Sequence, residues 1–187
     1  EEKYTSSFNL DYLLNFGSVF FSRGKRAFPG LHFQINLLRP KSTGSVRLKN
    51  SNPNEDLQIN PNWFSDLSDM DDLIEGMKHM REVLSKPSLN NIVSEELLPG
   101  KDIKSIEDMK ESVRNHVQTG HHPASTCAMG SDNNKLAVLD EKLRVKGIKN
   151  LRVVDASSFP DMISGNINAS VIMLAEKAAD MILENIN

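Results

Sequence analysis

The chain has 187 residues, 39% hydrophobic and 25% charged, which is an ordinary globular composition and enough for one substantial domain or one domain and an extension. The net charge of −3 comes from well-mixed signs, without the Lys/Arg run that is typical of a nucleic-acid or lipid surface. No apolar stretch approaches the ~18 residues that a membrane span requires. The single cysteine, Cys127, excludes an internal disulfide and fits secreted and cytoplasmic proteins alike.

The first part of the chain predicts little regular structure before residue 33. Residues 1–32 mix polar and aromatic side chains, and we interpret them as loop and short helix. Residues 33–49 are predicted as a strand–turn–strand unit, because both ends alternate in polarity around the turn cluster 40–44. The Asn- and Pro-rich stretch that follows is predicted as a loop, with room for a short strand at 57–59.

Two helices are predicted in the middle of the chain. Apolar residues at helical spacing predict a helix up to Ser85, capped by Asp69 or Asp71 and stopped by Pro87. After an irregular stretch, Ser105-Ile106-Glu107-Asp108 resembles a capping box that opens a second helix, which we expect to end near residue 118, before a glycine.

The C-terminal part predicts one short strand and one long helix. After a loop and a short extended piece at 136–145, residues 151–155 form an apolar run ending in an acid, which we interpret as a buried strand. Residues 168–185 carry one broad apolar face at helical spacing, interrupted by Glu176, and predict the final helix.

Two segments contain residue types suited to chemistry. In 121–130, His122 lies on a predicted loop, where an imidazole can exchange protons near neutral pH. In 151–170, an acid followed by small residues suits close approach of a ligand, and Gly165 permits unusual backbone geometry. Asn166 and Asn168 lie at the start of the final helix, where unpaired N–H groups favour an electron-rich ligand atom.

These segments resemble the signatures of the glucose–methanol–choline (GMC) family of flavin-dependent alcohol oxidoreductases, in particular its insect glucose dehydrogenase-like members. His121–Gly130 is similar to the family's motif aromatic-His-x-x-Gly-Thr-Cys-x-Met-Gly. The run from Leu151 to Ser170 is similar to its C-terminal signature, Asp-Ala-Ser, then Pro, then Ser-Gly-Asn-x-Asn-Ala. Pro40–Val46 resembles a further family turn, Pro-x-Ser-x-Gly-x-Val. The resemblance is strong over 117–184 and looser over 33–85.

The resemblance implies a tightly bound FAD and oxidation of an alcohol, in which a base removes the hydroxyl proton while hydride passes to flavin N5. His122 falls at the family's active-site histidine, and Asn166 falls where a second His or Asn pairs with it around the substrate oxygen. The implied cofactor contacts come from the end of the predicted strand and the start of the final helix: Asp155, Ala156, Ile167 and Asn168.

The resemblance also implies the architecture. We expect an α+β fold: an antiparallel-rich sheet flanked by helices in a substrate-binding domain over 1–147, with 148–187 contributing a strand and a helix to an FAD-binding domain. The family's Gly-x-Gly-x-x-Gly motif, which places the pyrophosphate at a helix N-terminus, is absent from this sequence. We therefore expect the adenine and pyrophosphate site to lie on polypeptide outside this sequence.

Departures from the family pattern keep a second interpretation open. His121 replaces an aromatic residue, Ser125 a glycine and Ala128 a common Lys or Arg. Together with the missing glycine motif, these changes also fit an inactive fragment or pseudoenzyme that acts as a binding or structural module. The expected partners of the active form are a small-molecule alcohol, sugar or sterol-like alcohol and an electron acceptor, oxygen or quinone-like, with neither nucleic acid nor a membrane span.

Other polar residues are interpreted without a ligand. Neighbouring histidines rarely converge on one ion, so we expect no metal at His121 and His122. Cys127 is interpreted as a small buried residue rather than a nucleophile. The sequon that begins at Asn168 opens a helix expected to face the cofactor, so we expect it to remain unglycosylated.

Overall fold

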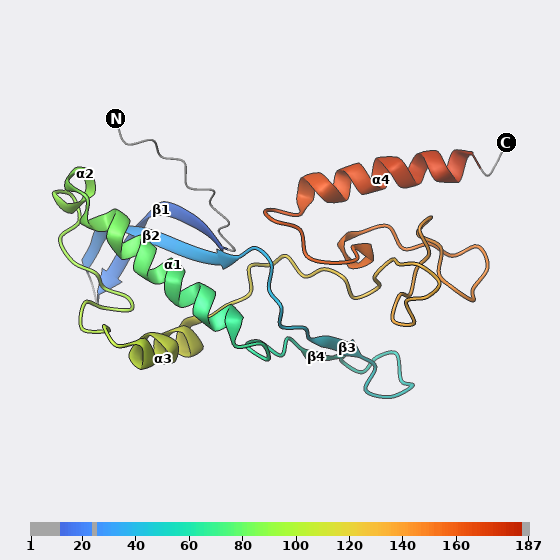
Figure 1. Cartoon of the computed structure of the whole chain (residues 1–187), viewed down its shortest axis with the longest axis horizontal. Helices are drawn as coiled ribbons and strands as arrows, with labels where there is room; N and C mark the ends of the chain where they lie inside the picture. The colour runs from blue at the N-terminus through green and yellow to red at the C-terminus, as the bar shows by residue number, and fades with distance from the viewer. Residues whose placement is uncertain (1–11, 24–25, 185–187) are drawn as a thin grey trace. The chain divides into compact units, whose positions relative to one another are not determined.

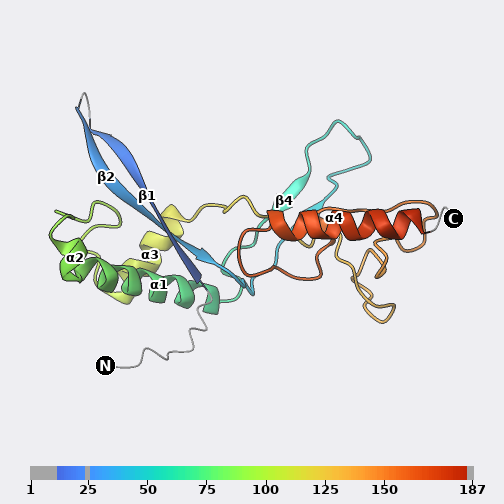
Figure 2. The same ribbon diagram turned by 90° about the horizontal axis from the view of Figure 1, so that it is seen from above.

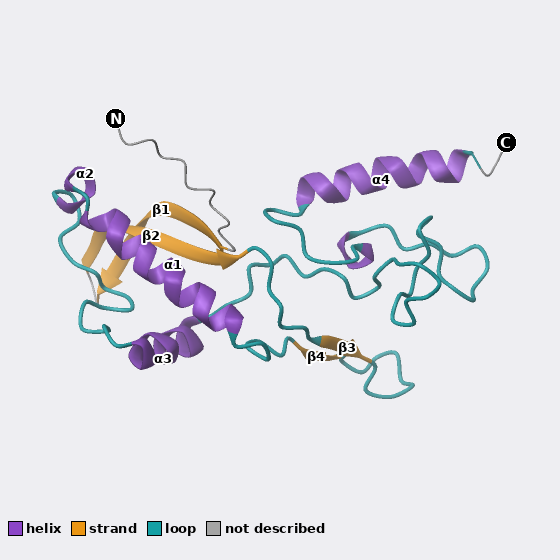
Figure 3. Ribbon diagram, viewed as in Figure 1, coloured by secondary structure: helices purple, strands orange, loops and turns teal. Residues whose placement is uncertain are grey.

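The computed structural model of the chain describes residues 12–23 and 26–184, and over these residues it is an α+β structure of antiparallel strands and helices (Figure 3). The strands are β1 (Tyr12–Arg23), β2 (Arg26–Leu37), β3 (Ser45–Arg47) and β4 (Gln58–Asn60). The helices are α1 (Ser68–Ser85), α2 (Pro87–Asn90), α3 (Ile106–His116), the 3₁₀ helix η1 (Ala156–Ser158) and α4 (Asn168–Leu183). The chain divides into two compact units, which we describe separately: unit 1 is Glu1–Ser42 with Phe64–Gln118, and unit 2 is Thr43–Trp63 with Thr119–Asn187.

Unit 1 is built on the long antiparallel pair β1–β2, whose register runs from Tyr12 opposite Leu37 to Arg23 opposite Arg26 (Figures 1 and 2). The prediction of loop and short helix is therefore wrong for the described residues up to 32, whereas residues 1–11 lie outside the described part. The pairing includes a proline, Pro29, which lacks the N–H that a strand donates to its neighbours. A proline therefore argues against a strand when only the sequence is considered. It is tolerated in an edge strand, where its nitrogen can face away from the neighbouring strand.

Helices α1 and α3 complete unit 1. Helix α1 packs against β2, and α3 packs against α1. Met70 and Ile74 lie one turn apart on α1 and form a buried cluster with Met109 of α3. Partly buried Phe64, Met77, Ile103 and Val113 pack around this cluster. The predicted helical spacing of the apolar residues in α1 is confirmed by this core.

The helix starts differ in how they are capped. Ser105 caps α3 as predicted, because its Oγ accepts the Asp108 N–H at 3.1 Å. The N-cap of α1 is Leu67, without a side-chain cap, so neither predicted aspartate has that role. Asp69 is instead buried, and its two carboxylate oxygens accept the main-chain N–H groups of Lys41 and Ser42, each at 2.8 Å. This carboxylate fixes the turn cluster to the first turn of α1.

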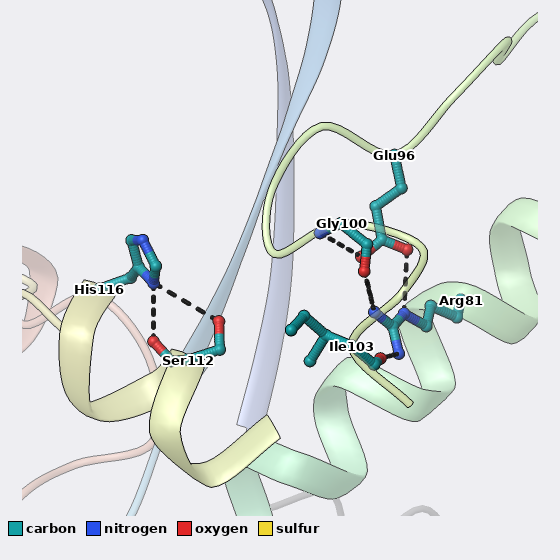
Figure 4. Close-up of polar contacts among 6 residues, drawn as sticks. All are labelled: Arg81, Glu96, Gly100, Ile103, Ser112 and His116. Carbon is teal, nitrogen blue, oxygen red and sulfur yellow. Dashed lines mark hydrogen bonds and ion pairs between the residues drawn. The ribbon is translucent and has the colours of Figure 1, made fainter. Parts of the chain in front are cut away.

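Arg81 of α1 holds the loop that joins α2 to α3 (Figure 4). Its Nε and Nη2 donate to the Glu96 carboxylate at 2.9 and 2.7 Å. Its Nη1 donates to the Ile103 carbonyl at 2.6 Å, and Nη2 also donates to the Gly100 carbonyl at 3.2 Å. The same figure shows His116, whose Nδ1 lies 2.8 Å from the Ser112 carbonyl in the last turn of α3. One guanidinium thus closes a loop that has little regular structure.

Unit 2 has its own core and few regular strands. Partly buried neighbours surround a core of buried residues from three segments. The buried residues are Leu139, Leu143, Phe159, Leu174 and Ala178. Residues 151–155 do not form the predicted strand; they contribute an isolated antiparallel bridge between Arg144 and Arg152. The predicted 33–49 unit is also corrected, because β2 pairs with β1 whereas β3 pairs with β4.

The turn before this bridge is organised by Asp140. Its carboxylate accepts the N–H groups of Lys142 and Arg144 at 2.9 and 3.0 Å, and the Arg144 Nε at 2.7 Å. Burial alone would raise the pKa of Asp140, but these hydrogen bonds outweigh it and hold the pKa below the usual value of a carboxyl group. The turn positions Leu143, which is buried in the core of unit 2.

Helix α4 is confirmed as the final helix and has two different faces. Leu174 and Ala178, one turn apart, are buried in the core of unit 2. Ile172, Met173 and Leu183 lie on the same helix and are exposed. The broad apolar surface expected from the sequence is thus only partly covered by the described residues.

Candidate active site

Three main-chain hydrogen bonds align the two signature segments of unit 2. The N–H of Ser125 donates to the carbonyl of Ala156 at 3.2 Å, that of Cys127 to Ser157 at 2.8 Å, and that of Met129 to Ser158 at 3.0 Å. The alternation of donors at every second residue is that of an extended segment lying beside η1. Segments that are about 30 residues apart in the sequence therefore meet without any side-chain contact being required.

His122 lies on the loop that leads into this alignment. Its side chain is half-buried, whereas that of His121 is exposed. The backbone is left-handed at His121, with φ of 59°, and again at Ser125, with φ of 69°. The N–H of His121 donates to Thr119 Oγ1 at 3.0 Å, which closes the turn before His122. His122 is thus held between two sharp backbone turns.

Asp155 organises the opposite segment. Its Oδ1 accepts the Ser157 N–H at 2.7 Å, and the Ser157 hydroxyl donates to the same oxygen. Ser158 is buried, and its hydroxyl donates to the Asp155 carbonyl. These two serines were not singled out from the sequence, although a carboxylate two residues before a serine is a common local turn signal. Asp155 remains exposed and is oriented by its own turn.

The start of α4 follows a left-handed glycine and has no side-chain cap from its N-cap residue. Gly165 has φ of 119°, a value that side chains other than glycine rarely adopt. Asn166 follows and is exposed, while Ile167 is half-buried against the core of unit 2. Ile167 is the N-cap of α4 and makes no side-chain capping bond, and Asn168 begins the helix. The Ile167 side chain therefore does not cap the first-turn N–H groups, which in any helix lack intrahelical acceptors and favour an electron-rich atom.

Hydrogen bonds and packing link some of the predicted residues within the described part of the chain, but not all of them. Ala156 is joined to the histidine segment through Ser125, and Ile167 packs on the same core as Ala156. His122 and Asn166 both lie in unit 2, and no hydrogen bond within the described part of the chain links them. Cys127 is half-buried rather than fully buried.

Two further searches concern the described residues alone. Within 12–23 and 26–184, no three His, Cys, Asp or Glu side chains gather as a metal site would require. Nor does any helix in these ranges have the length and apolarity needed to cross a membrane.

The donor set suits a flavin better than it suits a metal. An uncapped helix start after a left-handed glycine offers N–H groups to an acceptor edge, and a ring carbonyl of an isoalloxazine is such an edge. An exposed carboxylate at Asp155 is suited to hydroxyl groups such as those of a ribityl chain. The residues present therefore fit the part of FAD that the resemblance assigns to them.

Comparison with known proteins identifies the family. Residues 40–175 match the GMC oxidoreductase family. An oxygen-dependent choline dehydrogenase of Photobacterium profundum is 41% identical over 164 residues, which is 87% of this chain and 29% of that protein. An alcohol dehydrogenase [acceptor] of Pseudomonas putida is 37% identical over 166 residues, 88% of this chain and 30% of that protein.

A solved structure shows the same fold. A formate oxidase of Aspergillus oryzae, studied for the modification of its FAD, superposes with a TM-score of 0.80 at 32% identity, covering 88% of this chain and 29% of that one. This chain thus spans less than a third of the length of each of these three relatives. The matched region includes both signature segments, and the chain belongs to the GMC oxidoreductase family of FAD-dependent enzymes, of which it represents the C-terminal portion.

Proposed function

We propose that this chain is the C-terminal catalytic part of an enzyme that oxidises a CH–OH group with FAD. The observation that carries the proposal is the alignment of the histidine segment with the Asp155–Ser158 turn by three main-chain hydrogen bonds. When bound, FAD supplies the hydride acceptor at N5. The similarity to choline and alcohol dehydrogenases supports a small alcohol as substrate. The electron acceptor is oxygen or a quinone-like molecule.

His122 is the proposed base. An imidazole can take the hydroxyl proton near neutral pH, and the left-handed residues His121 and Ser125 shape the backbone that carries it. Asn166 is proposed to hydrogen-bond the same substrate oxygen through its amide. Positioning from both sides aligns the carbon–hydrogen bond for transfer and removes much of the entropic cost of reaction.

Four residues are proposed to hold the cofactor. Asp155 and Ala156 would hold the ribityl and phosphate part, and the N–H groups of Ile167 and Asn168 would donate to the N1/O2 edge of the ring. With FAD bound, these fixed donors would stabilise negative charge on the cofactor, and so favour the transition state over the ground state.

The division into domains is part of the proposal. Residues 148–187 complete an FAD-binding domain formed mainly by upstream polypeptide, and residues 1–147 supply the substrate side. The exposed Ile172 and Met173 of α4 support the first assignment, because an apolar helix surface is stable when another element covers it. Unit 2 also contains Thr43–Trp63 and 119–147, so the two compact units do not coincide with this proposed division of the chain.

The test uses the longer polypeptide that includes the upstream region. We expect His122→Ala to slow flavin reduction by about 10²–10⁴-fold in stopped-flow absorbance, with FAD content unchanged. His121→Ala is the matched control, because the His121 side chain is next to His122 in the sequence, is exposed and has no proposed role. Unaltered reduction in the His122 variant would contradict the mechanism. A longer polypeptide without flavin absorbance would favour the alternative of an inactive binding or structural module.

Asn166→Asp tests the second catalytic residue. Aspartate keeps the turn-forming chemistry of asparagine but places an anion beside developing negative charge. Losing one fixed donor to such charge costs about 10²–10³-fold in rate, and we expect a loss of that size in flavin reduction. If the variant folds, retains FAD and is reduced at the parent rate, Asn166 is only a turn residue.

A further inference from the structure

The two-stranded sheet β3–β4 of unit 2 has one apolar face that the described residues leave exposed. Val46 and Ile59 are directly paired across the strands, and Ile59 is 68% exposed. Leu48 follows the end of β3 and Leu57 precedes the start of β4, and Leu48 is 76% exposed. Because side chains alternate between the faces of a strand, the paired Val46 and Ile59 point to the same side, and the exposed Leu48 and Leu57 adjoin the ends of the two strands.

The opposite face is polar without exception. Ser45 pairs with Asn60, and Arg47 pairs with Gln58. A strict alternation of this kind is the pattern of a sheet with one buried and one solvated face. A single exposed leucine needs no explanation, but a contiguous apolar face on one side of a sheet marks a contact surface.

The geometry of this sheet is fixed by a close backbone contact. A Cβ on Gly44 would lie 2.2 Å from the carbonyl oxygen of Asn60 and 2.7 Å from that of Pro61. The turn can therefore approach the end of β4 only because residue 44 has no side chain. A hairpin of two three-residue strands is marginal in water, and a packed apolar face is what normally stabilises it.

We infer that the apolar face of β3–β4, formed by Val46 and Ile59 with Leu48 and Leu57 at the strand ends, is covered by the polypeptide that precedes this sequence in the same protein. The inference rests on the proposed function, in which this chain is the C-terminal part of a longer enzyme. The relatives indicate that the covering polypeptide is large, because the match spans only 29% of the choline dehydrogenase. Unit 2 is thus joined to the upstream region at a second place besides α4.

Two other occupants fit the surface less well. A stable dimer buries about 800 Å² on each partner, and four side chains fall short of that area. A lipid surface favours basic neighbours, but Lys49 beside this face is paired with Glu55 at 2.9 Å. An intramolecular contact needs neither a large area nor a basic rim, because the two surfaces are already on one chain.

The experiment measures cysteine accessibility in the longer polypeptide with Cys127→Ser as background. Val46→Cys and Ile59→Cys place a thiol on the apolar face, and Arg47→Cys and Gln58→Cys are the matched controls on the same strands. If the face is covered, labelling needs a local opening, so we expect maleimide to react at least about tenfold more slowly on the apolar side. All four variants should react alike in denaturant. Equal rates in the folded protein would overturn the inference.

FAD content and flavin reduction are measured on the same samples, so the two proposals can fail separately. A protein that binds FAD and is reduced by alcohol, but reacts equally on both faces, keeps the function and loses the covered face. A protein without FAD that still protects the apolar side loses the function only. Protection that appears only at high protein concentration, or only with phosphatidylglycerol vesicles, would assign the face to a second copy or to lipid and overturn the inference.

Discussion

At the scale of single residues, the departure at Ser125 has a physical cost. Its φ of 69° lies in the left-handed region, where a side chain crowds the backbone by about 1–2 kcal/mol. The GMC pattern has glycine at this position, and glycine adopts that region freely. Ser125 therefore lies where the backbone favours a residue without a side chain. Its N–H also donates one of the main-chain hydrogen bonds between the two signature segments.

Ser125→Gly should therefore stabilise the chain. Relief of the left-handed strain is partly offset by the greater freedom of glycine in the unfolded state, so we expect a gain of up to about 1 kcal/mol in the free energy of unfolding. Ser125→Val should destabilise by at least about 1 kcal/mol, because a β-branched residue tolerates this region least. Urea denaturation measures both.

A neighbouring position gives the control for this prediction. Thr126 has no left-handed backbone, so Thr126→Gly should lower stability by about 0.5–1 kcal/mol. If glycine lowered stability equally at both positions, strain at Ser125 would not be the reason for the family's glycine.

Motif spacing alone names His122, Asn166, Asp155 and the start of α4 as candidates, and their roles stay predictions. The main-chain bonds between Ser125 and Ala156 could not be predicted, because they do not depend on side-chain type. The local pairing of the Asp155 carboxylate with Ser157 was also missed. A motif identifies residues expected to bind a ligand, but it does not predict which residues hold the backbone in place through hydrogen bonds.

At the scale of elements, the Arg81 contact is the main support of the loop between α2 and α3. One planar guanidinium satisfies the Glu96 carboxylate and two carbonyl oxygens (Figure 4). A lysine has one compact ammonium and cannot form these contacts at once. We expect Arg81→Lys to lower the free energy of unfolding by about 1.5–3 kcal/mol, the range of hydrogen bonds to charged groups, and to speed amide exchange over 96–104.

An exposed ion pair is the control for Arg81. Lys86 pairs with Glu82 at 2.9 Å on the solvent side of the same region. Lys86→Gln should change stability by less than about 1 kcal/mol, because exposed pairs contribute little. Equal effects of the two variants in chemical denaturation would show that Arg81 is an ordinary surface charge.

The helices were easier to predict than the strands for a physical reason. The Ser105 capping box and the apolar spacing of α1 and α4 are local signals, and they gave helix limits within a few residues. The β1–β2 pair depends on contacts between strands, and Gly17 and Pro29 within it weaken the local signal. For residues 151–155, a run of apolar side chains suggested a strand, but only one bridge forms.

At the scale of the whole molecule, the described residues bury two separate hydrophobic clusters. One contains Met70 and Ile74 of α1 with Met109 of α3, and the other contains Leu139 and Leu143 with residues of α4. Each cluster draws its members from one compact unit. A substitution that destabilises one cluster should therefore raise amide exchange first in the elements that contribute residues to that cluster.

Leu139→Ala tests this separation. Leu139 is 0% exposed, and removing a buried leucine side chain costs about 2–5 kcal/mol through lost burial and the cavity left behind. Amide exchange should rise in α4, whose Leu174 and Ala178 share the cluster, and should stay near the parent rate in α1 and α3. Val138→Ala, at a side chain that is 40% exposed, should leave exchange in all three helices nearly unchanged. If Leu139→Ala accelerated exchange in α1 and α3 as much as in α4, the two clusters would form one cooperative core, and the units would not be independent in stability.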